Sequence, residues 1–170
     1  MSNFCITVSN NQNEFQVDEL KLEKIGTVMF NYLLIKPDIL NLSTLKDCDL
    51  SNKILSIDIL ICDDKEIREL NSKYRNIDKP TDVLSFAIYA DCPECKTIPG
   101  DMISLGDIVI SAQTTKRQAD ENDKSFDEEI NFLLSHGLLH LMGFDHTNDE
   151  ELNFMLKIQD EMIEYGMNNI

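Results

Sequence analysis

Long apolar runs are missing from this sequence. The longest uncharged apolar stretch, residues 25–35, is too short to span a bilayer, and residues 1–5 lack a basic region followed by an apolar one. Linker-like stretches, internal repeats and low-complexity segments are missing as well. We therefore expect residues 1–170 to form a single domain with a substantial core, in a soluble, cytoplasmic protein.

Basic residues are scarce. Only 15 Lys and Arg accompany 31 Asp and Glu, which gives a net charge of −16. Such a chain repels a phosphate backbone at long range, so composition alone argues against a nucleic-acid substrate, although local geometry can override it. Much of the acid falls in residues 120–123, 127–129 and 149–151, which are typical of helix ends and solvated faces that favour solubility.

Cysteine occurs in an odd number. Five cysteines cannot all pair internally, and without a secretion signal we expect reduced thiols. Cys92 and Cys95 have a spacing that can bind zinc or form a redox pair. The second pair of a structural zinc site and a thioredoxin-like pattern are both missing, so ordinary loop thiols are the favoured interpretation.

Hydrophobic periodicity and capping signals predict a mixture of strands and helices. Strands are expected at residues 4–8, 54–62, 83–88 and 105–110, and helices at 17–34, 63–74, 111–122, 125–141 and 149–166. Residues 43–51, 75–81 and 89–102 are expected to be connections. This order favours an α+β fold, a small sheet of about four strands covered by about five helices, with the helix over 125–141 against the sheet.

All three histidines lie within one short stretch. His136 and His140 are one helical turn apart, separated by about 40° around the axis, so they project from one face. Gly143 stands where a helix would end in a left-handed residue, after which the chain can turn back and present His146. Any one of these histidines alone would be read as a packed core residue. Together they predict a metal site, with zinc favoured and a fourth position open to water, which implies catalysis.

The same stretch follows the long zinc-protease pattern H-E-x-x-H-x-x-G-x-x-H at every marked position except one. Gly137 stands where the protease has its glutamate. That glutamate is the general base of peptide hydrolysis, and glycine offers no proton acceptor. A peptidase is therefore disfavoured, although the metal cradle remains.

Several segments between about residues 54 and 165 resemble the YbeY family of ribosomal-RNA maturation factors, which are metal-dependent endoribonucleases of bacteria. The segments that carry the resemblance are Leu70-Asn71 through Tyr74-Arg75 with Asp78, Pro80-Thr81-Asp82-Val83-Leu84-Ser85-Phe86, Leu105-Gly106-Asp107-Ile108, and His136-Gly137 with Leu139-His140-Leu141, Gly143, Asp145 and His146.

The resemblance implies a zincin-like α+β fold, one zinc ion held by His136, His140 and His146, and a functional arginine at Arg75. It also implies a zinc-dependent single-strand endoribonuclease that acts in ribosomal-RNA maturation, at the 3′ end of the small-subunit RNA, and in ribosome quality control. Its partners would be ribosomal RNA and ribosomal particles, without a membrane. Because the chain is so acidic, a basic ribosomal protein could deliver the substrate.

Chemistry agrees with a role for Arg75. Phosphodiester cleavage develops negative charge on the non-bridging oxygens, and a guanidinium can meet two of them with parallel hydrogen bonds. Arg75 falls in a predicted loop, whereas Arg68 and Arg117 fall in predicted helices. A surface ion pair is the alternative role for this arginine.

The proton acceptor is not evident from the sequence, because Gly137 removes the usual one. Asp107 and Asp145 are candidates, and Asp145 has orientation of a ligand histidine as an alternative role. Two other functions stay open. One is a metallopeptidase-like hydrolase, and the other is a non-catalytic, metal-clipped ribosome assembly factor, in which protein would fill the fourth coordination position.

Overall fold

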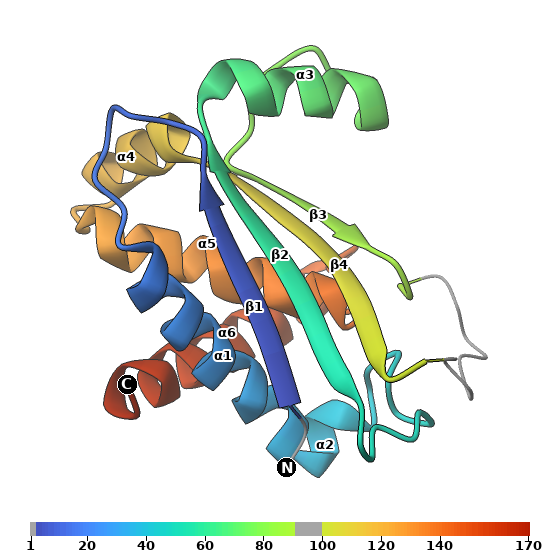
Figure 1. The fold of residues 1–170 in the computed structure, drawn as a ribbon. Helices are drawn as coiled ribbons and strands as arrows, with labels where there is room; N and C mark the ends of the chain where they lie inside the picture. The colour runs from blue at the N-terminus through green and yellow to red at the C-terminus, as the bar shows by residue number, and fades with distance from the viewer. Residues whose placement is uncertain (1–2, 91–99) are drawn as a thin grey trace.

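The computed structural model describes residues 3–90 and 100–170. Four strands form one sheet in the order β1-β2-β4-β3 (Figure 1). They are β1 (Asn3–Asn10), β2 (Ile54–Cys62), β3 (Val83–Ala87) and β4 (Met102–Ser111). β1, β2 and β4 are parallel, whereas β3 runs antiparallel beside β4. This order, which the sequence did not predict, places β3 at one edge of the sheet.

Six helices accompany the sheet in the described residues. They are α1 (Glu19–Ile35), α2 (Pro37–Leu40), α3 (Asp64–Arg75), α4 (Ala112–Glu121), α5 (Phe126–Leu141) and α6 (Asp149–Asn168). α1 and α5 pack on one face of the sheet, and α6 packs against these two helices, while α3 lies over one end of the other face (Figure 1). The expected α+β fold is confirmed. One helix was not expected from the sequence. It is α2, a single turn that begins at Pro37, two residues after the end of α1.

Alternation along the strands divides the core between the two faces. Ile57, Ile59 and Ile61 of β2 are buried on the face that α1 and α5 cover. On the opposite face, Val109 of β4 packs in a smaller cluster with Ile67 of α3. Burying each such aliphatic side chain stabilises the fold by about 1.5–3 kcal/mol. The larger layer therefore holds α5 firmly against the sheet.

β4 begins three residues earlier than expected, and it contains a bulge. Ser104 pairs with Ser56 and Gly106 pairs with Ile57, so Leu105 is an extra residue in β4. Gly106 has φ 132°, and a side chain there would collide with the carbonyl oxygen of Phe86. The bulge interrupts the simple alternation of polar and apolar residues, which explains why the start of this strand was predicted as loop.

Two further expectations concern segments outside these elements. Cys92 and Cys95 lie outside the described residues. Among the helices that are described, none combines the length and the apolar character needed to cross a bilayer.

Candidate metal centre

α5 carries two of the three histidines and begins with the capping box that the sequence predicts. The Ser125 side chain accepts a hydrogen bond from the Glu128 backbone, and the Glu128 side chain accepts one from the Ser125 backbone. The apolar stripe of the helix is buried against the sheet, with Phe126 at its start only partly covered. His136 and His140 flank this stripe and are half-buried. Gly137 faces β4 rather than solvent.

The end of α5 turns the chain back toward the helix. Gly143 has φ 86°, a left-handed conformation that glycine adopts at little cost. The amide of Gly143 donates to His140 O at 3.0 Å, and that of Phe144 donates to Leu139 O at 3.1 Å, the pair of bonds that defines a Schellman motif. His146 follows three residues after Gly143, on the returning chain.

The three imidazoles converge. One ring nitrogen from each of His136, His140 and His146 can be chosen so that all three lie within 4.8 Å of one another. The Nε2 atoms of His136 and His140 are 2.9 Å apart. Nitrogens around a tetrahedral zinc ion, with bonds of about 2.0–2.1 Å, would lie about 3.3 Å apart. The set therefore fits a divalent cation that prefers imidazole, and it forms a potential metal site.

Burial keeps two of these imidazoles neutral. Desolvation lowers the pKa of His136, and a hydrogen bond with Gln159 opposes this effect. Desolvation also lowers the pKa of His140, against a hydrogen bond with the backbone of Phe144. A neutral imidazole offers the lone pair that a metal needs, so both rings are suited to binding near neutral pH.

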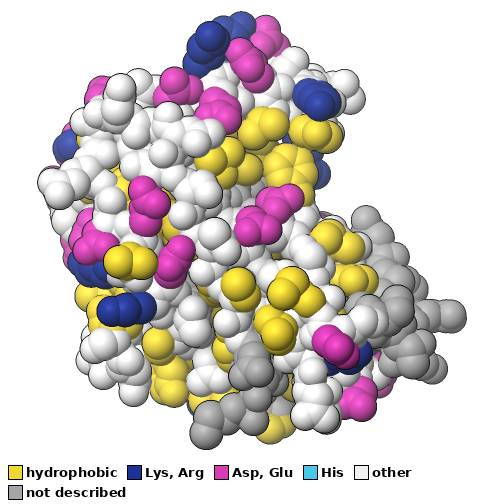
Figure 2. All heavy atoms as spheres, viewed as in Figure 1, with side chains coloured by type: hydrophobic (Ala, Val, Ile, Leu, Met, Phe, Trp, Pro, Cys, Tyr) yellow, Lys and Arg dark blue, Asp and Glu magenta, His cyan; other side chains and the backbone are white. Residues whose placement is uncertain are grey.

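A cleft of about 1050 Å³ opens beside the histidines. Its walls are α5, the edge strand β3, the turn after α5 and the first half of α6. The polar and charged residues that line it are Arg75, Asp82, Ser85, His136, His140, Asp145 and His146. Figure 2 views the sheet face that bears α3, and no histidine is visible on that face.

Arg75 is the last residue of α3, so the expectation that it lies in a loop is wrong by one residue. Asn76 adopts φ 59° as the left-handed cap, which lets the helix continue through position 75. The Arg75 Nη2 donates to Ser85 O of β3 at 3.2 Å, beside the cleft. In the described part of the chain the other two arginines pair with carboxylates, Arg68 with Asp78 and Arg117 with Asp64. Arg75 instead bonds a carbonyl, so a surface ion pair is not its role there.

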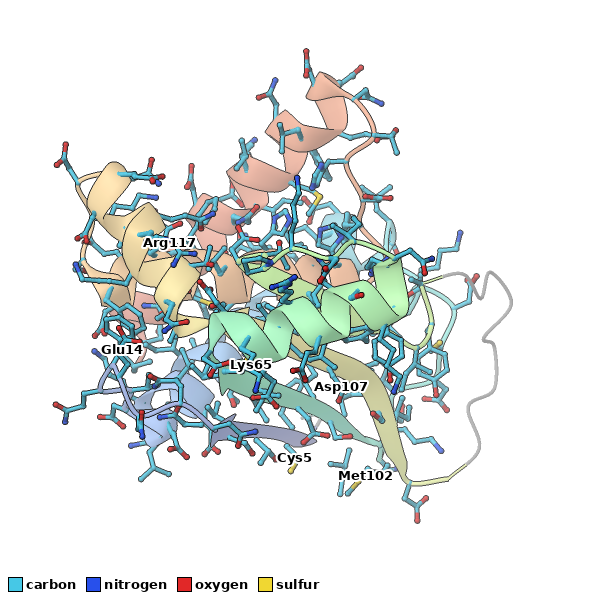
Figure 3. The ribbon with its side chains drawn as sticks, turned by 90° about the horizontal axis from the view of Figure 1, so that it is seen from above. Cys5, Glu14, Lys65, Met102, Asp107 and Arg117 are labelled. Carbon is cyan, nitrogen blue, oxygen red and sulfur yellow. The ribbon has the colours of Figure 1, made fainter. Side chains whose placement is uncertain are left out.

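Asp107 does not reach this cleft, and its candidacy as proton acceptor is wrong. It shares a sheet face with Val109, the face on which α3 lies (Figure 3). Its strand partner there is Asp58. Desolvation, followed by repulsion from Asp58, raises the Asp107 pKa. The bulge in β4 and the strand order determine this placement, and neither was predicted.

Two other carboxylates line the cleft. Asp145 Oδ1 accepts a hydrogen bond from the His146 backbone at 2.8 Å, which stabilises the turn that presents His146. Asp82 was not predicted as a site residue. Its Oδ1 accepts from Val83 N at 2.8 Å and its Oδ2 from Gln118 Nε2 at 3.0 Å. Asp82 also raises the pKa of His136 through its negative charge, a minor cause beside burial.

Gln159 of α6 is a second residue that sequence reasoning missed. Its side chain is fully buried, and its Oε1 lies 3.1 Å from His136 Nδ1. The helix was expected to present an apolar stripe, and Met155 and Met162 do form it. A polar glutamine at a core position of this stripe could have indicated a role for Gln159 in the site.

Known proteins resemble this chain in both sequence and fold. The sequence model of the family described as Endoribonuclease YbeY matches residues 7–166. A protein of that name from Caldicellulosiruptor saccharolyticus is 38% identical over 163 residues, which cover 94% of this chain and 95% of that one. Another from Bacillus velezensis is 46% identical over 114 residues, which cover 65% of this chain and 73% of that one.

Other matches cover less of the relative or show the fold alone. A protein named Endoribonuclease YbeY from Prochlorococcus marinus is 46% identical over 110 residues, 65% of this chain, and the match spans only 58% of the relative. The solution structure of TM1509 from Thermotoga maritima has a TM-score of 0.59 at 21% identity, over 96% of this chain and 90% of that one. The α+β fold agrees with the zincin-like class that the family resemblance implies. The chain therefore belongs to the Endoribonuclease YbeY family.

Proposed function

We propose that this chain is a zinc-dependent, single-strand endoribonuclease of ribosomal-RNA maturation. It acts at the 3′ end of the small-subunit RNA and in ribosome quality control, as a single domain over residues 1–170, in the cytoplasm. The observation that carries the proposal is the convergence of three imidazole nitrogens within 4.8 Å of one another. They lie in the same cleft as Arg75.

His136, His140 and His146 would hold one zinc ion. Zinc supplies Lewis acidity, which polarises a phosphoryl oxygen and lowers the pKa of water toward about 7. In the described residues, the metal-ligating cluster consists of these three side chains. Three protein ligands would leave the fourth tetrahedral position to solvent or substrate, which is typical of catalytic rather than structural zinc sites.

Arg75 would stabilise the charge that develops on the phosphate. Its guanidinium is exposed beside the cleft, and its hydrogen bond to Ser85 O uses one N–H donor and leaves the others for a ligand. A planar guanidinium can donate to two phosphate oxygens at once. Loss of His136 would remove a metal ligand and abolish the reaction, which makes it the second essential residue.

Asp82 and Asp145 are the carboxylates available to accept a proton. Both line the cleft. Both oxygens of Asp82 already accept hydrogen bonds, from Val83 N and from Gln118 Nε2. Asp145 is exposed, and its bond to the His146 backbone uses Oδ1, so Oδ2 is the better placed of its oxygens for this role. We assign the proton transfer to one of these two residues.

The net charge of −16 favours delivery of the substrate by a partner. The negative charge of the protein would repel free RNA, whereas it would attract a basic ribosomal protein. The metallopeptidase alternative is disfavoured, because position 137 faces β4 and cannot present a base to the cleft.

Cleavage of ribosomal particles and of free RNA, measured side by side, tests the function. Precursor small-subunit particles and the same RNA stripped of protein are incubated with zinc-loaded protein and with His136→Ala. The wild-type protein should cut the particles well and the free RNA poorly, and the variant should cut neither. Equal cutting by the variant would contradict the assignment, and equal cutting of both substrates would refute delivery by a partner.

A further inference from the structure

Gln159 of α6 is fully buried where α6 packs against α5. Its neighbours on the inner side of α6 include Met155, Ile158 and Met162, which are apolar. A polar amide is costly in such surroundings unless its atoms are hydrogen-bonded. The bonds that it makes therefore determine how the amide is oriented.

The orientation follows from the hydroxyl of Ser135. That hydroxyl donates its single hydrogen to Phe132 O at 2.8 Å, so toward Gln159 it can only accept. Gln159 Nε2 lies 3.2 Å from Ser135 Oγ and 3.3 Å from Phe132 O. Both of these atoms are acceptors. The end of the amide that faces them must be the NH₂ group.

The other end of the amide then determines the tautomer of His136. Gln159 Oε1 lies 3.1 Å from His136 Nδ1, and a carbonyl oxygen can only accept. His136 Nδ1 must carry the proton. A neutral imidazole has one N–H, so Nε2 keeps its lone pair. That Nε2 is the atom that lies 2.9 Å from His140 Nε2.

We propose that Gln159 is a positioning residue of the metal centre, which selects the Nδ1-protonated tautomer of His136 and points its Nε2 at the other two histidines. This role rests on the proposed metal site. Many metal-bound histidines have a carboxylate as this partner. A neutral amide adds no negative charge, so the cation keeps more of its attraction for a phosphodiester.

Three variants separate positioning from packing. Gln159→Leu removes the hydrogen bonds at similar size, and Gln159→Glu keeps an acceptor facing His136. Met162→Ala is the control for stability, because this buried, apolar side chain lies on the same helix and takes no part in the hydrogen bond between Gln159 and His136. Long-range ¹H–¹⁵N spectra of the metal-free proteins at about pH 8, where imidazole is neutral, report the tautomer directly. Competition with a chelator then measures the Kd for zinc.

We expect the Nδ1–H tautomer in the wild-type protein and in Gln159→Glu. Gln159→Leu should give a mixture of tautomers, with the Kd for zinc raised by about 10-fold to 100-fold. Met162→Ala should lose stability while keeping the wild-type tautomer and Kd. An Nε2–H tautomer in the wild-type protein, or a Gln159→Leu variant with unchanged tautomer and Kd, overturns the positioning role alone. Failure of the wild-type protein to bind zinc overturns the metal site and, with it, this role.

Discussion

Gly137 of α5 lies directly against the side chain of Ile108 of β4. A Cβ added at Gly137 would lie 2.9 Å from both Cδ1 and Cγ2 of Ile108. Such distances are shorter than van der Waals contact, so any side chain here would push α5 away from β4. Because His136 and His140 are on that helix, their distance from the sheet depends on the absence of a side chain at residue 137.

Gly137→Ala should therefore destabilise the protein by about 1–3 kcal/mol, although alanine favours helices more than glycine does. Gly166→Ala is the matched control. Its Cβ would lie 3.1 Å from Cγ of Met29, a flexible side chain that can move, so we expect little change. Urea unfolding of both variants measures the difference. A Gly137→Ala protein as stable as Gly166→Ala would show that the helix and sheet are not tightly apposed.

Arg75→Ala should lower kcat/KM for RNA cleavage by about 10²-fold to 10³-fold, the usual cost of losing one donor to a developing oxyanion. Arg75→Lys should recover part of the loss, because it keeps the charge but not the paired donors. The fold should be unaffected, since the described contact of Arg75 is a single bond to Ser85 O.

Arg68→Ala is the control for Arg75, because Arg68 is exposed on the same helix and forms an ion pair with Asp78. Its removal should leave both cleavage and the unfolding free energy essentially unchanged, because solvent screens an exposed ion pair. Equal losses of activity in the Arg68 and Arg75 variants would point to general electrostatics rather than to a specific contact.

The stability of the metal-free protein should fall on mild acidification. Burial lowers the pKa of His136 and of His140 in the folded state, while the unfolded values stay near about 6.5. Below that pH the unfolded chain binds protons that the folded chain does not, so stability is full above about pH 6.5 and is lost as the pH falls toward the folded pKa.

Urea unfolding between about pH 8 and pH 5 measures this dependence for the wild-type protein and for His140→Gln. The variant should lose less stability over the same range, since one buried imidazole is gone. Identical pH profiles for the two proteins would show that His140 is not held neutral.

Removal of one ligand should remove the metal. The wild-type protein should contain one zinc per chain and be stabilised by about 2.7 kcal/mol when free zinc is 100 times its Kd. His140→Ala should contain no zinc and gain nothing from added zinc. Asp107→Asn, which changes a carboxylate outside the cleft, is the control and should behave as the wild type. Metal analysis after gel filtration, with thermal unfolding, decides between these outcomes.

The features that the sequence predicted depend on neighbours close in the chain. The capping box at Ser125 and the left-handed turn at Gly143 involve residues no more than five apart, and both are present. Asp107 and Gln159 depend instead on packing between distant segments. A single extra residue in β4 and the order of the strands decide which face Asp107 occupies. No local sequence pattern reveals the bulge or the strand order, so the face of the sheet that Asp107 occupies could not be predicted.

Strand β3 borders the cleft along all of its residues from Val83 to Ala87. Neighbouring side chains of a strand point in opposite directions, so a continuous border of this kind is made by the peptide groups themselves. Every residue type except proline supplies the same peptide N–H and C=O. Substitutions in β3 would therefore leave the peptide donors and acceptors on that side of the cleft unchanged. Substitutions on α5 and α6 would instead change the side chains on the other side, and with them the choice of substrate.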